Sequence, residues 1–151
     1  MSGWLLDTNV LSELRRKQPE AAVARFVSGQ PLTSLYVSEV TLAEIRFGIE
    51  LIDDAVRRAE LHHWLDQRLR PLFEQRTLAL TEDILLQWRL MIESGRKRGH
   101  TFSHPDVLIA ATAAEYGLTV VTRNVKEFVA AGVPVFNPWK DGDFGDQSAA
   151  G

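Results

Sequence analysis

Short apolar runs alternate with longer stretches of helical periodicity along most of this chain. Each apolar run is short enough to form one buried strand, and apolar residues three or four positions apart are typical of a helix with one buried face. The predicted strands are 4–6, 35–37, 77–80, 119–122 and 133–136. The predicted helices with defined ends are 19–28, 42–52, 53–75, 107–116 and 124–131. A further helix is predicted to begin after 7–9, and another begins at 85 and ends near 95 or 99.

Glycine and proline residues support these boundaries. Gly117 and Gly132 each follow a helical stretch, where glycine commonly ends a helix. Pro71 is expected to bend or break the stretch 53–75, and Pro134 predicts an edge position for the last strand because proline lacks the N–H that a sheet ladder needs. The alternation of strands and helices predicts an α/β domain with a central, mostly parallel sheet of about four to five strands flanked by helices.

Length and composition fit one such domain. The chain has 151 residues, of which 45% are hydrophobic and 25% are charged, a balance typical of globular proteins. We expect one domain over 1–140 and a flexible tail over 141–151, DGDFGDQSAAG, which has little to bury. The absence of cysteine excludes disulfide scaffolds, thiolate metal sites and cysteine nucleophiles. Neither a signal peptide nor a membrane-spanning run is evident, so a cytoplasmic protein is expected.

Three carboxylates stand where predicted strands end and helices begin. Asp7 follows the first strand, Glu44 lies in the first turns of a helix among apolar neighbours, and Asp106 stands at the start of the helix 107–116. Because ligands of parallel α/β sheets bind beyond the carboxyl ends of the strands, these side chains are expected to face one crevice. Crowded carboxylates repel unless a cation neutralises them, and hard oxygen ligands select Mg²⁺ or Mn²⁺. Such an ion can activate water and stabilise the leaving oxygen of a phosphodiester.

Each of these acids also has a purely structural interpretation. Asp7 can be a helix cap, and Thr41-x-x-Glu44 and Ser103-x-x-Asp106 both have the spacing of a capping box. For each acid taken alone, capping is the more frequent explanation. Capping does not explain why Glu44 stands among apolar residues, where an unpaired carboxylate is costly.

Four sequence blocks carry a family resemblance. In chain order the blocks are LLDTNVL, TLAEIRFG, PDVLIAATAAEYG and VTRNVKEF. They resemble the blocks of PIN-domain proteins, and within that family those of the VapC toxins of bacterial toxin–antitoxin pairs. The closing VPVFNPW is similar to the FitB-like branch. The resemblance covers Leu5 to Trp139 and implies a PIN-like α/β domain over that range.

The resemblance implies a Mg²⁺- or Mn²⁺-dependent endoribonuclease that acts as the toxin of a type II toxin–antitoxin system. In the matching blocks, Asp7 and Asp106 are the expected metal ligands, and Glu44 is expected to bind metal or to orient the attacking water. The family often has a fourth acid after the Thr-Arg pair of the late strand. This chain has Asn124 there, whose amide can hold a metal or a water but adds no negative charge. The expected supporting and substrate-contacting groups of the same blocks are Thr8, Asn9, Thr122 and Arg123.

The resemblance also implies partners. A cognate antitoxin, a small VapB-like DNA-binding protein, is expected to inhibit the enzyme by placing a side chain such as arginine near the acids. RNA is the expected substrate, and DNA is expected to be contacted only through the antitoxin complex. Apolar residues such as Phe47 and Leu51 exceed what one small sheet requires, so some are expected to pair with a partner chain, as an antitoxin segment would. The assembly is expected to be a homodimer or a hetero-oligomer. Ordinary core packing explains most of these apolar residues equally well.

Basic residues at the end of the helix before Asp106 are candidates for contacts with the RNA backbone. They are Arg96, Lys97 and Arg98, and a solvated basic helix end is the alternative interpretation. The whole chain has 17 Lys+Arg against 20 Asp+Glu, a net charge of −3, which argues against bulk electrostatic capture of nucleic acid. Three of these acids belong to the predicted site and three to the predicted tail, so the body of the fold can still be mildly basic.

Two other functions stay open at this point. One is a nuclease-like binding module that oligomerises and supports DNA binding and autoregulation by a partner antitoxin, which Asn124 and the net charge favour. The other is a phosphatase with Asp7 as nucleophile. The phosphatase is disfavoured because such enzymes typically need a second acid two residues later, where this chain has Asn9.

Overall fold

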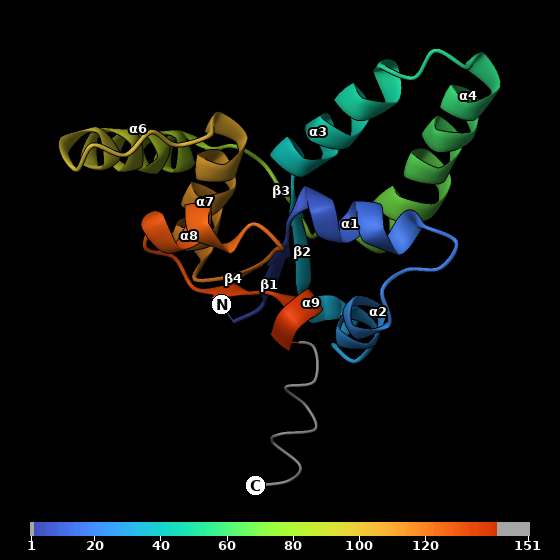
Figure 1. Ribbon diagram of the computed structural model, residues 1–151, viewed down its shortest axis with the longest axis horizontal. Helices are drawn as coiled ribbons and strands as arrows, with labels where there is room; N and C mark the ends of the chain where they lie inside the picture. Colours follow the sequence, from blue (N-terminus) through green and yellow to red (C-terminus); the bar gives the residue numbers. More distant parts are fainter. Residues whose placement is uncertain (1, 142–151) are drawn as a thin grey trace, which may run out of the picture.

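A five-stranded sheet forms the centre of the structure, a computed structural model that describes residues 2–141 (Figure 1). All strand pairings are parallel, and the strand order is β3-β2-β1-β4-β5. The strands are β1 (Trp4–Leu6), β2 (Leu35–Ser38), β3 (Thr77–Leu78), β4 (Thr119–Val121) and β5 (Val135–Phe136). The predicted α/β fold with a parallel sheet is therefore confirmed, including the edge position of the strand that follows Pro134.

The register of the central strands divides the apolar residues between two cores. Leu5 lies opposite Val120 and Leu6 opposite Val121, and all four side chains are fully buried. Because side chains alternate along a strand, Leu6 and Val121 enter the core on one face of the sheet, and Leu5 and Val120 enter the core on the other. Burial on both faces explains why these strands are almost continuously apolar.

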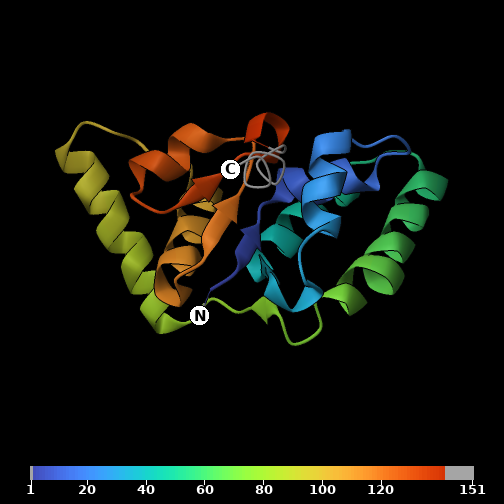
Figure 2. The same ribbon diagram turned by 90° about the horizontal axis from the view of Figure 1, so that it is seen from below.

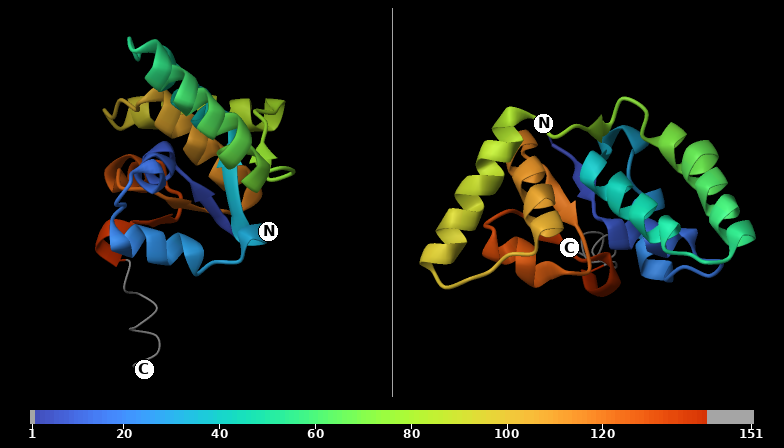
Figure 3. Two further views of the ribbon diagram at one scale, coloured as in Figure 1. Left: turned by 90° about the vertical axis from the view of Figure 1, so that its right-hand side faces the viewer. Right: turned by 90° about the horizontal axis from the view of Figure 1, so that it is seen from above.

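Helices cover both faces of the sheet (Figures 2 and 3). The face that contains Leu6 packs against α1 (Thr8–Arg15), α2 (Ala21–Ser28), α3 (Glu39–Glu50) and α4 (Ala55–Trp64). The face that contains Leu5 packs against α6 (Glu82–Lys97), α7 (His104–Tyr116) and α8 (Val125–Ala130). A 3-10 turn, Leu32–Ser34, precedes β2, and α9 (Pro138–Asp141) contacts α2. The sheet is thus the middle of three layers.

Local sequence sets the starts and ends of the helices that hold the site. The Ser38 hydroxyl accepts a hydrogen bond from the N–H of Val40 at 3.0 Å and starts α3 directly after β2. Gly117 ends α7 with a φ of 65°, a left-handed conformation that glycine adopts because it has no Cβ. These two residues fix where the chain leaves β2 and where it turns back into β4.

The stretch 53–75 is not one regular helix. The helix α4 passes into a π-helical turn, Leu65–Leu69, and then into the short helix α5 (Arg70–Leu72). Pro71 lacks an N–H, and in a regular helix its ring would clash with the carbonyl four residues earlier, so the widened turn lies directly before it. The expected interruption is confirmed, but helical structure ends at Leu72 and does not reach residue 75.

Ile84, not Leu85, is the fully buried residue in the first turn of α6. The apolar spacing typical of this helix runs through Leu85, Trp88 and Ile92, of which Leu85 is 39% exposed while Trp88 and Ile92 are partly buried. Several consecutive residues of α6 are apolar, so the pattern alone does not choose between neighbouring positions. The choice is made by the packing of α6 along α7.

The structure describes almost nothing of the predicted tail. The predicted tail 141–151 lies outside the described residues except for Asp141, which ends α9, so the division at residue 140 stays a prediction. Within residues 2–141, none of the helices has both the length and the apolar character needed to cross a membrane.

Phe128 of α8 offers a test of the core around Leu5. Its side chain is fully buried, so Phe128→Ala is expected to lower the free energy of unfolding by about 3–5 kcal/mol through lost burial and a cavity. Val129 on the same helix is 60% exposed, and Val129→Ala is expected to change that free energy by less than about 0.5 kcal/mol. Urea denaturation measures both, and equal losses would contradict this placement of α8.

Candidate functional site

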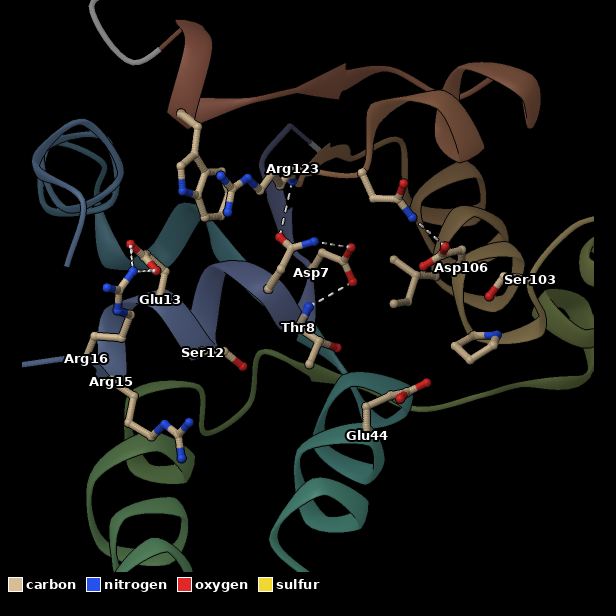
Figure 4. Close-up of a pocket in the computed structure, with 15 residues that line it drawn as sticks. Asp7, Thr8, Ser12, Glu13, Arg15, Arg16, Glu44, Ser103, Asp106 and Arg123 are labelled. Atoms are coloured by element: carbon tan, nitrogen blue, oxygen red, sulfur yellow. Dashed lines mark hydrogen bonds and ion pairs between the residues drawn. The ribbon is translucent and has the colours of Figure 1, made fainter. Parts of the chain in front are cut away.

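A cavity of about 620 Å³ opens at the carboxyl ends of β1 and β4 (Figure 4). Asp7 enters it directly after β1, Glu44 from α3, and Asp106 from the first turn of α7. The structure therefore brings the three predicted acids to one cavity. Asn124, which follows β4, lines the same cavity.

Asp7 is both a helix cap and part of the cavity wall. Its Oδ1 accepts a hydrogen bond from the N–H of Thr8 at 2.8 Å, which caps α1, and its Oδ2 accepts one from the hydroxyl of Thr122 at 2.7 Å. The side chain is buried, and this burial raises the pKa of Asp7, while the two hydrogen bonds oppose the rise. The capping interpretation is correct for Asp7, and the same geometry holds its carboxylate toward the cavity.

Thr122 is the centre of a small polar network. It is fully buried, and its hydroxyl oxygen accepts hydrogen bonds from Asn9 Nδ2 at 3.1 Å and from the N–H of Asn124 at 3.0 Å. Asn9 Oδ1 in turn accepts a hydrogen bond from the N–H of Arg123 at 3.2 Å. The predicted supporting residues therefore join the loop after β1 to the loop after β4.

Asp106 has the most perturbed carboxyl group of the site. Burial, together with the negative charges of Asp7, Glu127 and Glu44, raises its pKa to about 6. The amide of Asn124 donates a hydrogen bond to Asp106 Oδ2 at 2.8 Å, which partly opposes it. The crowding of carboxylates that the sequence suggested is thus real, and Asn124 takes part in the site through Asp106.

The capping-box interpretation fails for Glu44. Ser38, not Thr41, caps α3, so Glu44 lies in the middle of that helix. Thr41 is buried inside the helix. At α7, Ser103 occupies the cap position without a side-chain hydrogen bond to the backbone. Neither box forms, and the half-buried carboxylate of Glu44 points into the cavity in Figure 4.

The donor groups of the cavity suit a hard divalent cation. Asp7 and Asp106 supply carboxylate oxygens, and both already pay a desolvation cost that a cation would relieve. Within residues 2–141, no three acidic or histidine side chains lie close enough together to hold a metal ion among them. Mg²⁺ is commonly held by one or two carboxylates with several waters, so the open arrangement fits that ion.

The cavity also has a basic side, of which the sequence analysis named Arg123 but missed Arg15 and Arg16. Arg15 and Arg16 of α1 lie across the cavity from Asp106 in Figure 4, and Arg123 lies above Asp7. The spacing of Thr8, Ser12 and Arg15 was the available signal, because residues four and three positions apart share one face of a helix.

The predicted basic contacts lie elsewhere. Arg96, Lys97 and Arg98 do not line the cavity. Arg96 forms an ion pair with Glu93, and Arg98 donates a hydrogen bond to the carbonyl of Ala130 at 3.1 Å. A contact of these residues with RNA stays a prediction.

Trp139 has two roles. It is partly buried and packs against the core at the end of the fold. Its ring also lines the cavity, with the guanidinium carbon of Arg123 at 5.2 Å from the ring centroid. The indole therefore holds the side chain of Arg123 beside the acids through a cation–π contact.

Known proteins are similar to this chain in sequence and in fold. The family model described as PIN domain matches residues 4–132. Toxin FitB of Neisseria gonorrhoeae is 39% identical over 137 residues, which cover 91% of this chain and 99% of FitB. VapC ribonuclease Y4jK of Sinorhizobium fredii is 34% identical and covers 90% of this chain and 97% of its own length. The solved structure of FitAB bound to an IR36 DNA fragment matches with a TM-score of 0.84 and 37% identity, over 90% of this chain and 95% of the other.

Asp106 is expected to produce a pH-dependent stability difference. Its pKa is about 6 in the folded state against an ordinary value of 3.8, so the folded state binds the proton more tightly than the unfolded state between these values. The contribution of Asp106 to the free energy of unfolding therefore falls as the pH rises from about 4 to about 6. In metal-free buffer, Asp106→Asn should remove this fall.

The measurement is urea denaturation of wild type and Asp106→Asn across that pH range. The stability difference should grow in favour of the variant as the pH rises and should level off above about pH 6. Asp53→Asn, at an exposed position outside the cavity, is the control and should show no such trend. A difference independent of pH would show that the Asp106 pKa is not raised.

Proposed function

This chain belongs to the PIN domain family, and from that premise we propose that it is the toxin of a toxin–antitoxin pair and a metal-dependent ribonuclease. The observation that carries the proposal is the meeting of Asp7, Glu44 and Asp106 in one cavity, with the pKa of Asp106 raised to about 6. Such a group of acids is costly to the fold by itself and becomes favourable when a cation is bound.

Each residue of the site has a role in this proposal. Asp7 and Asp106 hold Mg²⁺ or Mn²⁺, and Glu44 faces them from α3 to bind the ion or orient a water. Thr122 fixes the orientation of Asp7, and Asn124 fixes that of Asp106. When bound, the ion supplies an activated water and stabilises the leaving oxygen of the RNA phosphodiester. Asn124 contributes no charge, which favours a site with one tightly held ion.

The charges of the cavity support an ordered sequence of binding. Four carboxylates and three guanidiniums line it, so with all of them ionised its net charge is −1, and one divalent ion changes this to +1. The cavity therefore attracts an RNA phosphate only after the ion is bound. Arg123, held over Trp139, is placed to neutralise charge on that phosphate.

Substitution of the metal ligands tests the enzymatic proposal. Asp7→Asn and Asp106→Asn are each expected to lower RNA cleavage in Mg²⁺ or Mn²⁺ by more than about 100-fold with the fold intact, since loss of a group that only orients a ligand costs about 10- to 100-fold. Thr122→Val, which removes such an orienting group, is expected to lower the cleavage rate by about 10- to 100-fold. The measurement is the single-turnover cleavage rate, with circular dichroism as a check of folding.

The cleavage assay includes a control variant, and a DNA-binding assay with the partner tests the alternative function. Asp53→Asn should cleave as wild type does. Wild-type protein that cleaves no RNA with any of several divalent ions would contradict the proposal. If DNA binding with the partner also survived loss of all three acids, the protein would be a binding module for an antitoxin instead.

The antitoxin is proposed to block the cavity. FitB is a toxin by name, and FitAB was solved as a complex bound to DNA. For this chain we place a cationic side chain of the antitoxin, such as arginine, against Asp7 and Asp106, where it competes with the metal ion. Contact with DNA then comes through the antitoxin.

A second surface is proposed to join two copies of the chain. The Phe47 surface is a hollow of about 780 Å³ formed by α3, α7 and the residues after β3, with Phe47, Leu80 and Leu108 in its apolar lining. Phe47 is 62% exposed, and contiguous apolar patches of this kind commonly mark contacts with another chain. The hollow shares Glu44 with the acidic cavity, so a two-fold contact there would set two cavities side by side.

Phe47→Glu tests this assembly. A charge in the centre of the contact should convert the dimer to a monomer, measured by size-exclusion chromatography with light scattering. Val56→Glu is the control, because Val56 is 69% exposed on α4 and lies outside the Phe47 surface. A wild-type monomer, or a Phe47→Glu dimer, would contradict the proposed contact.

A further inference from the structure

A smaller cleft continues the acidic cavity along α1. The α1–α4 cleft has a volume of about 170 Å³ and shares Thr8, Ser12, Arg15 and Glu44 with the cavity. Its remaining walls are apolar side chains of α3 and α4 and of the turn between them, and Trp64 of α4 is one of them. The cleft is therefore a side arm of the site, polar where it meets the acids and apolar at its far end.

Arg15 differs from its neighbour Arg16 because no carboxylate forms an ion pair with it. Its guanidinium carbon lies 5.9 Å from the centroid of the Trp64 ring. The positive charge of Arg57 repels that of Arg15. Burial and Arg57 both lower the pKa of Arg15. Arg16, by contrast, is paired with Glu13 at 3.0 Å. Among residues 2–141, Arg15 thus has no anionic partner, and its donors are available to an anion.

The position of Arg15 on α1 indicates which phosphate it can reach. Thr8, Ser12 and Arg15 share one helix face, and α1 rises about 10 Å from the first of these residues to the last. The Arg15 guanidinium lies against Trp64 of α4, at the end of α1 away from Asp7, so it is placed for a phosphate other than the one held at Asp7 and Asp106. A phosphate of a neighbouring nucleotide can contact it, with the hydroxyls of Thr8 and Ser12 along the path.

We propose that Arg15 and the α1–α4 cleft form an RNA subsite, in which Arg15 binds a backbone phosphate other than the one that is cleaved and the cleft receives the adjacent nucleobase. The inference rests on the proposed ribonuclease function and extends it to a subsite for single-stranded RNA. An apolar cavity of roughly 150 Å³ holds one benzene ring, so a cleft of about 170 Å³ has the size for a flat ring. Base stacking and a cation on the backbone are the usual means of binding single strands.

Binding of a short RNA hexamer tests the subsite directly. Fluorescence anisotropy in Ca²⁺, used in place of Mg²⁺ to limit turnover, measures the dissociation constant as a function of salt. Arg15→Ala is expected to weaken binding about 10-fold, the loss typical of one charge-assisted contact. It should also reduce the slope of log K against log salt by about 0.7, the value for one phosphate of a single strand. Arg15→Lys should keep the slope while losing part of the affinity.

A control and a comparison with shorter RNA make the assignment specific. Arg68→Ala removes an exposed cation that lines neither cavity and should leave affinity and slope as in wild type. A dinucleotide has too few phosphates to reach Arg15, so the affinity ratio of hexamer to dinucleotide should fall in Arg15→Ala. Thermal stabilisation by Mn²⁺ should be equal in wild type and Arg15→Ala, which shows that the fold and the metal site are intact.

The outcomes separate this inference from the proposed function. If wild-type protein binds and cleaves RNA but Arg15→Ala binds the hexamer equally well, the subsite is wrong and the ribonuclease stands. If Arg15→Ala weakens only binding of the antitoxin, the cleft takes an acidic segment of that protein and the RNA subsite is wrong. If wild-type protein neither binds nor cleaves RNA, both the proposed function and the subsite fall.

Discussion

The hydrogen bond from the hydroxyl of Thr122 to the carboxylate of Asp7, at 2.7 Å, is the contact on which the site depends. It exists because β1 and β4 are adjacent parallel strands, so the residues that follow them emerge at the same edge of the sheet. Asp7 is nearly buried there and would be costly without donors. The same hydroxyl accepts from Asn9 and from the backbone of Asn124, so one buried threonine orients the groups on both sides of the cavity.

The electrostatics of the site follow from this placement. Burial and neighbouring acids raise the pKa of Asp106 to about 6, which means that the folded chain holds carboxylates in a position that disfavours their charge. A fold keeps such an arrangement where a bound cation reverses the cost, as at a metal site. The guanidiniums of Arg15 and Arg123 stand at the margins of the same cavity, where they favour an anion once the acids are neutralised.

The helix α1 connects the acidic part of the site with the Arg15 guanidinium at its margin. It begins directly after Asp7, which caps it, and it ends at Arg15, which lies against Trp64 of α4. A rigid helix therefore sets the separation between the proposed metal site and the proposed phosphate subsite. Packing of α1 against α3 and α2 holds it in place, so the spacing does not depend on a loop. Such placement on regular elements is typical of sites that need defined distances.

Local features of the sequence were enough to predict the alternation of strands and helices, the ends marked by Gly117, and the group of Asp7, Glu44 and Asp106, because residue type, periodicity and position after a strand are local properties. The tertiary structure decided the rest. Whether Glu44 faces the other acids, and whether Arg15 or the run that begins at Arg96 borders them, depends on how helices pack on the sheet. The pKa of Asp106 depends on the burial and charges of distant segments. Distances between segments and their shared electric field arise only when the chain is folded.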